Sequence, residues 1–299
     1  MESQELATAQ NLRVHVERLA GEIGERNVFR PEALQVAAEY IERQWRRQGY
    51  AVERLGYEVR GARCFNLEIT RSGAARNDQI LLIGAHYDTV PGSPGANDNG
   101  SGVAALIELS RLFADLEPAT TVRFVAFVNE EPPFFMTDLQ GSMVYADMAR
   151  RRGDDIRLMV CLETMGCYSD KPGSQGYPPL FKFFYPDRAN FIGFVSNFRS
   201  WSPMRRLAAA FRRGSDFPLE TTAMFPFVPG VSWSDHRSFW VQGFRAVMVT
   251  DTAFYRYPHY HAASDTPDRL DYSSLSRVTL GLHSALWNLQ TSALNDGAM

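Results

Sequence analysis

The spacing of apolar residues predicts two helices at the start of the chain. Apolar residues recur at intervals of three and four, as on one face of a helix, in two sets: Leu12, Val16, Leu19 and Ile23, and then Leu34, Ala37, Ile41 and Trp45. The second set lies between Pro31, which can begin a helix, and Gly49, which can end one. Residues 51–59 and 64–70 alternate between apolar and polar and predict half-buried strands.

Four later segments are almost continuously apolar. They are QILLIGA (79–85), TVRFVAFV (121–128), DIRLMVCLE (155–163) and RAVMVT (245–250). Helical patterns lie between them at 103–113 and 144–151, and another through 275–289 closes the chain. Buried strands that alternate with helices are typical of a sheet covered on both faces. We therefore expect an α/β fold with three layers, α/β/α, around a central mixed, mostly parallel sheet, in a single domain over residues 1–299.

One segment, at about residues 173–233, fits this scheme poorly because it is rich in aromatic residues, proline and glycine. We interpret it as a loop-rich region near the carboxyl end of the sheet. Its aromatic side chains either line an apolar pocket or pack locally within the loops, and the sequence does not decide between these two interpretations.

The composition is that of an ordinary soluble globular protein, with 45% hydrophobic and 22% charged residues in a chain of 299. A net charge of −3 gives no reason to expect nucleic acid or a membrane surface as a partner. The three cysteines show no disulfide framework. Without a signal-peptide pattern or a stretch of ~20 apolar residues, we expect a cytoplasmic protein, unless a signal was removed. Nothing indicates the oligomeric state.

Acidic and imidazole residues follow each of the apolar runs. In open α/β sheets, ligands bind beyond the carboxyl ends of the strands. The residues that collect there are His86, Asp98, Glu130, Glu131, Glu163, Asp251, His259 and His261. Taken singly, each has an ordinary structural explanation, such as a helix N-cap for Asp98. The adjacent pair Glu130 and Glu131 does not, because two carboxylates after a buried strand repel each other unless a cation is present.

These residues suit zinc, which accepts imidazole nitrogen and carboxylate oxygen, although cobalt or manganese could replace it. One bridging carboxylate can hold two such ions ~3.5–4 Å apart, as in co-catalytic hydrolases. A further carboxylate would then be left to act as a general base.

The order of six motifs resembles that of the zinc-dependent aminopeptidase family, which includes bacterial leucyl aminopeptidases, glutamate carboxypeptidase and, more distantly, glutaminyl cyclase. The motifs are AHYDT, ANDNGSG, NEE, LETMG, SDH and HYHAASDTPD, spread over about residues 81–268. Each motif is weak alone, but the ordered set is specific. The resemblance implies a zinc-aminopeptidase (phosphorylase/hydrolase-like) fold and an aminopeptidase that hydrolyses the N-terminal peptide bond of peptides with a free N-terminus.

The resemblance also implies a role for each matched residue. The expected ligands of two zinc ions are His86 and Glu163 for one ion, Glu131 and His261 for the other, and Asp98 as the bridge. Glu130 would be the general base, and Asp88 would orient the His86 imidazole. Possible positions for second-layer or substrate contacts are Asp235, His236 and Tyr260.

Two features of this assignment stay open. Glu163 stands where the family usually has aspartate, so the geometry of that ligand could differ. In an extended segment the side chains of His259 and His261 point to the same side, so geometry alone does not choose between them. His261 is favoured only because it is followed, after three residues, by the Asp-Thr with which the family's motif ends.

Two other functions compete with the aminopeptidase. One is a glutaminyl cyclase-like acyltransferase with a single zinc ion. The NDNGSG motif of this chain resembles the peptidases more closely than the cyclases. The other is a binding domain of the same fold that has lost catalysis, although such a domain would be expected to lack some of these ligands.

Overall fold

The computed structural model describes residues 2–179 and 181–291. Its helices are α1 (Glu2–Val16), which continues into the π-helical turn η1 (Glu17–Ile23), α2 (Pro31–Arg47), α3 (Gly102–Phe113), α4 (Gly141–Arg152), α5 (Trp201–Gly214), α6 (His236–Val241) and α7 (Tyr272–Thr291). Its strands are β1 (Glu53–Val59), β2 (Ala62–Arg71), β3 (Arg76–His86), β4 (Thr120–Phe127), β5 (Asp155–Glu163), β6 (Ile192–Ser196), β7 (Leu219–Ala223) and β8 (Ala246–Thr250).

All eight strands form one sheet in the order β1-β2-β4-β3-β5-β8-β6-β7. The four parallel pairs are β3/β4, β3/β5, β5/β8 and β6/β7, and the three antiparallel pairs are β1/β2, β2/β4 and β6/β8. The expectation of a mixed, mostly parallel sheet is therefore confirmed. The parallel group β4-β3-β5-β8 brings four carboxyl ends to the same edge.

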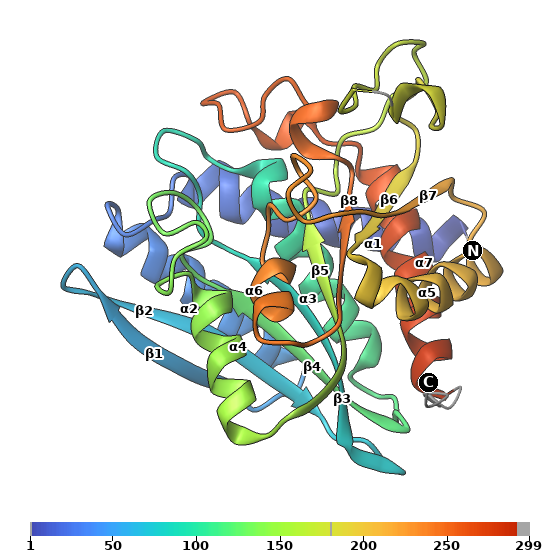
Figure 1. Ribbon diagram of the computed structural model, residues 1–299. Coiled ribbons are helices and arrows are strands. Elements are labelled where there is room, and N and C mark those ends of the chain that lie inside the picture. Colours follow the sequence, from blue (N-terminus) through green and yellow to red (C-terminus); the bar gives the residue numbers. More distant parts are fainter. Residues whose placement is uncertain (1, 180, 292–299) are drawn as a thin grey trace.

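Helices cover both faces of this sheet, which confirms the three-layer arrangement (Figure 1). Alternate residues of β3 point into two separate cores, as the period of a strand requires. Leu81 and Ile83 belong to the larger core, beneath α1, α2, α3, α5 and α7. Ile80 and Leu82 belong to the smaller core, which includes Tyr145 of α4 and Phe239 of α6.

The expectation of a loop-rich segment at 173–233 is wrong for residues 192–223, which form β6, α5 and β7 and complete the sheet. Helix α5 buries one side, through Met204, Leu207 and Phe211, and carries arginines elsewhere. The strands on either side of it have only five residues each, which is too short for alternation to stand out. Within the described part of 173–191, a 3₁₀ turn at Phe181–Phe183 is the only helix.

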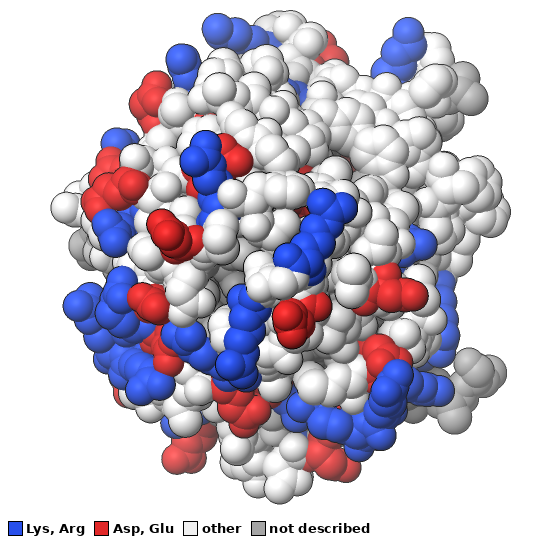
Figure 2. All heavy atoms as spheres, turned by 90° about the vertical axis from the view of Figure 1, so that its left-hand side faces the viewer, with Lys and Arg blue, Asp and Glu red and all other residues white. Residues whose placement is uncertain are grey.

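Strand β1 forms one edge of the sheet, where its one partner among the described strands is β2. Its exposed positions include Glu53, Arg54 and Glu58. Charged side chains on an edge strand oppose pairing with other chains. Figure 2 shows the side of the molecule on which β1 and α2 lie, where positive and negative side chains are interspersed. None of the described helices has the length and apolar content needed to cross a membrane.

Candidate metal centre

Candidate ligands lie at one edge of the sheet, at or just after the carboxyl ends of the adjacent strands β4, β3 and β5. Strand β3 ends at His86 and β5 ends at Glu163, while β4 leads within a few residues to the pair Glu130 and Glu131. Asp98 comes from the turn η2 (Ala96–Ser101) directly before α3. The convergence predicted for the carboxyl ends of these strands is therefore present.

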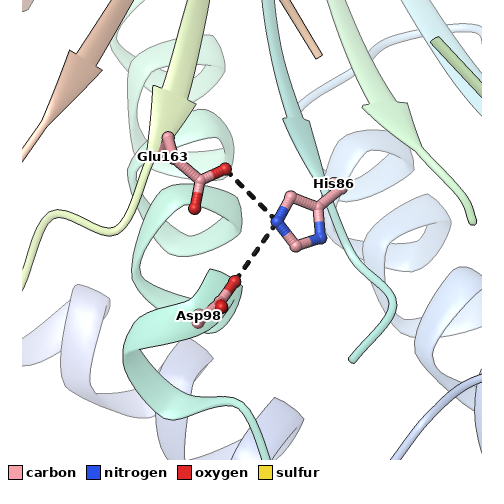
Figure 3. Close-up of side chains that lie close together, drawn as sticks. All are labelled: His86, Asp98 and Glu163. Atoms are coloured by element: carbon pink, nitrogen blue, oxygen red, sulfur yellow. Dashed lines mark ion pairs between the residues drawn. The ribbon is translucent and has the colours of Figure 1, made fainter. Parts of the chain in front are cut away.

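His86 lies between two carboxylates (Figure 3). Its Nε2 atom is 3.3 Å from Asp98 Oδ1 and 3.3 Å from Glu163 Oε2. All three side chains are buried. Their donor atoms lie within 4.8 Å of one another, which is the spacing of ligands around one metal ion.

A second group shares Asp98 with the first. His261 Nε2 is 3.1 Å from Asp98 Oδ2 and 3.3 Å from Glu131 Oε2. These three donor atoms also lie within 4.8 Å of one another. The two oxygens of the Asp98 carboxylate thus face two different imidazoles, as a bridging carboxylate does.

Glu130 lies beside the first group without belonging to either group. Its Oε2 atom is 4.0 Å from His86 Nε2. Burial raises the pKa of Glu130 well above its ordinary value, and the neighbouring carboxylates of Glu131 and Asp235 raise it further. Glu130 and Glu131, adjacent in sequence, are therefore differently placed: only Glu131 contacts Asp98 and His261 through the second group.

Asp88 contacts the glutamate pair more closely than it contacts His86. Its two carboxylate oxygens accept hydrogen bonds from the backbone N–H groups of Glu130 and Glu131, each over 3.1 Å. The distance from Asp88 Oδ1 to His86 Nδ1 is 3.6 Å, longer than a hydrogen bond. In this structure Asp88 therefore fixes the turn after β4, in addition to lying beside the imidazole.

Of the remaining candidates, Tyr260 is in direct contact with the second group. Its ring stacks on that of His261, with centroids 3.9 Å apart. Asp235 is fully buried near Glu130, and burial raises its pKa to about 7.

The imidazole of His236 points elsewhere, since its Nε2 bonds to the carbonyl oxygen of Val231 at 2.8 Å. His259 bonds to Ser264 through Nδ1 and belongs to neither group.

Several residues without a role predicted from the sequence hold these groups in place. Asp265 accepts hydrogen bonds from the backbone N–H groups of Asn97 (2.8 Å) and Asp98 (3.1 Å). Ser234 donates to Glu163 Oε2 over 2.6 Å. Both residues lie inside the motifs SDH and HYHAASDTPD, so their place in those motifs was the available signal.

The fully buried Arg26 also holds the site in place, but it lies outside all six motifs, so no motif indicated this role. It lies in the loop between η1 and α2 and donates hydrogen bonds to five backbone carbonyls, those of Leu19, Gly24, Tyr87, Pro94 and Gly95. Burial lowers its pKa to about 10. The arginine thereby fixes the proline- and glycine-rich loop that joins His86 to Asp98.

Gly102 shows why the motif ANDNGSG ends in glycine. A Cβ atom at this position would lie 2.7 Å from the carbonyl oxygen of Leu162 and 2.3 Å from Asn99 Oδ1. Without a side chain, the start of α3 packs directly against the end of β5, next to Glu163.

The charge of the site fits divalent cations. Four carboxylates are at most a few per cent exposed, and in the ionised form they carry four negative charges: Asp98, Glu130, Glu131 and Glu163. Burial and the nearby Asp98 raise the pKa of Glu131 to about 7. Among the described residues, Glu131 Oε1 and His86 Nδ1 are buried without a hydrogen-bond partner. Two divalent ions would balance this charge, so the donor set fits zinc.

Comparison with known proteins places the chain in one family. The model of "Peptidase family M28" matches residues 66–286. The uncharacterized protein YfbL of Escherichia coli is 36% identical over 291 residues, which cover 94% of this chain and 88% of YfbL. More distant relatives are described as probable zinc metalloproteases.

Solved structures share the fold. An aminopeptidase from Aneurinibacillus is 25% identical, with a TM-score of 0.57 over 76% of this chain, although the match spans only 48% of that longer protein. A glutaminyl cyclase from Fimbriiglobus ruber is 20% identical, with a TM-score of 0.67 over 93% of this chain and 94% of its own. The family match and the buried donor set agree: this chain belongs to peptidase family M28 and is a hydrolase of the metallopeptidase class.

Proposed function

We propose that this protein is an aminopeptidase with a co-catalytic pair of zinc ions. His86 and Glu163 would hold one ion, Glu131 and His261 would hold the other, and Asp98 would bridge them. The observation that carries the proposal is the division of the Asp98 carboxylate, whose Oδ1 lies 3.3 Å from His86 and whose Oδ2 lies 3.1 Å from His261. A structural salt bridge needs no such division between two imidazoles.

Glu130 would perform the proton transfers. Zinc, when bound, supplies Lewis-acid polarisation of the scissile carbonyl and makes the attacking water more acidic. Glu130 accepts a proton from that water as the water oxygen bonds to the carbonyl carbon. The C–N bond then breaks, and Glu130 delivers the proton to the leaving amine, which restores the carboxylate. Its position beside the first group, but outside both groups, supports this role.

The remaining residues would position these groups and the substrate. Asp88 holds the backbone of the glutamate pair, and the carboxylates of the site attract the free α-ammonium group of a peptide. Tyr260 stacks on His261 and lines a pocket, where its hydroxyl can donate a hydrogen bond to the substrate carbonyl oxygen.

The presence of both ligand groups favours this function over the alternatives. A cyclase with a single zinc ion needs only one group, and an inactive binding domain needs neither. The buried pair Glu130 and Glu131 would also be a costly feature for a domain that binds without metal.

Metal analysis together with a substrate panel tests the proposal. We expect about two equivalents of zinc per chain, hydrolysis of aminoacyl anilides, and no hydrolysis when the amino group is acetylated. An N-terminal glutaminyl peptide should be hydrolysed and not cyclised. One equivalent of zinc with cyclisation would favour the transferase, and activity that survives removal of the metal would exclude the mechanism.

A further inference from the structure

A strip of the sheet beside the metal centre faces a pocket and not a helix. Four residues are paired in one row across β5, β8, β6 and β7, namely Glu163, Thr250, Gly193 and Glu220. Paired residues point to the same face of a sheet. All four line one pocket. The next row faces the opposite core, where Phe194 packs against Phe211 of α5.

This pocket has a volume of about 110 Å³ and mainly aromatic walls. The walls come from three loops and include Tyr177, Phe181, Tyr185, Trp233, Phe254 and Tyr260. The ring of Tyr185 stacks against those of Tyr177 (5.8 Å) and Phe181 (5.9 Å). The pocket therefore answers the question that the sequence left open, since these aromatic residues both pack on one another and line a cavity.

The pocket begins at the metal centre and extends away from it. Glu163 and Tyr260 lie at one end, and the edge strand β7 lies at the other. A peptide with its α-amine at the metal centre would place its N-terminal side chain here. The middle of the floor is Gly193, which has no side chain to obstruct such a group.

Glu220 supplies a carboxylate at the far end. Three inter-strand spacings separate its backbone from that of Glu163, a distance of ~14 Å. The side chain is partly buried, and within residues 2–179 and 181–291 it forms no hydrogen bond or ion pair. Burial raises the pKa of Glu220, which reflects the cost of removing its charge from water, and the positive charge of Arg212 offsets part of this rise. The neighbouring Arg212 donates a hydrogen bond to the carbonyl oxygen of Leu219.

An aromatic pocket that ends in an unpaired carboxylate suits one kind of side chain. The aliphatic stem of lysine or arginine packs against aromatic rings, and its cation is attracted both by the ring faces and by a carboxylate. We propose that Glu220 makes this pocket select peptides whose N-terminal residue is lysine or arginine. This proposal rests on the aminopeptidase function, because it uses the metal centre to hold the α-amine.

The test compares lysine with norleucine, which has the same stem without the ammonium group. With the zinc-loaded chain, kcat/KM should be higher for the lysyl and arginyl anilides than for the norleucyl anilide. Glu220→Gln should lower kcat/KM for the two cationic substrates by about tenfold or more, and change the norleucyl value less than about twofold. Glu58→Gln, at the opposite edge of the sheet, should change neither.

Binding measurements separate the pocket from catalysis. Calorimetry should show that lysine amide binds the wild-type chain more tightly than norleucine amide does, and that Glu220→Gln removes the difference. If the chain hydrolyses no anilide but keeps this binding preference, the aminopeptidase proposal fails and the pocket assignment stands. If it hydrolyses norleucyl and lysyl anilides equally, and Glu220→Gln changes nothing, the pocket assignment is overturned alone. If the chain hydrolyses no anilide and shows no binding preference for lysine amide, both the aminopeptidase proposal and the pocket assignment are overturned.

Discussion

Asp265 holds the backbone of Asp98, because its Oδ2 accepts a hydrogen bond from the Asp98 N–H over 3.1 Å. Its Oδ1 accepts two more, from the backbone N–H of Asn97 at 2.8 Å and from the Tyr257 hydroxyl at 2.7 Å. Asp265 is fully buried, so water does not compete for these bonds. The position of the proposed bridging ligand therefore depends on a carboxylate that belongs to neither ligand group.

We predict that Asp265→Asn weakens zinc binding by ~10–100-fold, the usual effect of losing a residue that orients a ligand. The amide offers one acceptor oxygen and directs its NH₂ group at a backbone N–H, so Asp98 shifts. A zinc titration against a competing chelator measures the change. Asp268→Asn is the matched control, because that carboxylate lies in the same loop and is exposed. Equal affinities for wild-type and Asp265→Asn would contradict the positioning role.

The two adjacent glutamates should respond differently to the same substitution. Glu130→Gln removes the proton acceptor at constant size, so kcat should fall by ~10²–10⁴ while KM and zinc content change little. Glu131→Gln should instead lose the zinc ion of the second ligand group, because its carboxylate belongs to that group. Parallel assays of zinc content and kcat distinguish them. A Glu130→Gln protein that keeps most of its kcat, or that loses zinc, would reverse the two roles.

The residues of this centre differ in how visible they are in the sequence. Buried parallel strands show where they end, so the convergence of His86 and Glu163 followed from the pattern alone. The region β6-α5-β7 was not recognised, since its strands have five residues each and adjoin aromatic, proline-rich loops. Asp265 and Arg26 were also missed as positioning residues, because most of their partners are backbone groups, as far as 168 residues away. No local pattern encodes such contacts.

The histidines of the HYH sequence provide a direct test of the second ligand group. His261 Nε2 lies 3.1 Å from Asp98, whereas His259 bonds to Ser264 and contacts neither group. We therefore predict that His261→Ala loses zinc and activity, and that His259→Ala keeps both. Zinc analysis of the purified variants decides the matter. Loss of zinc only in His259→Ala would show that the loop after β8 presents the other imidazole.

His236 should make stability depend on pH. Burial lowers its pKa from 6.5 to about 4, so the folded protein holds it neutral while the unfolded chain takes up a proton below pH 6.5. The stability it contributes is complete above pH 6.5 and decreases as the pH falls towards 4, by about 3 kcal/mol in all. In urea unfolding of metal-free protein, His236→Gln should lose less stability between pH 7.5 and 5 than the wild type. Equal losses would contradict this prediction.

Glu163 provides the sharpest test of two separate ion sites, because it belongs to only one ligand group. It lies 3.3 Å from His86 Nε2, and Ser234 fixes its carboxylate through a 2.6 Å hydrogen bond. Removing this carboxylate leaves the first group with His86 and Asp98 alone, whereas the second group keeps all three donors. We therefore predict that Glu163→Ala binds about one equivalent of zinc tightly and a second one weakly, and that Glu131→Ala does the same at the other site. A cobalt spectrum recorded during titration would show which site fills first in each variant. Loss of both ions together in Glu163→Ala, or of neither, would mean that Glu163 is not the terminal ligand of a single ion.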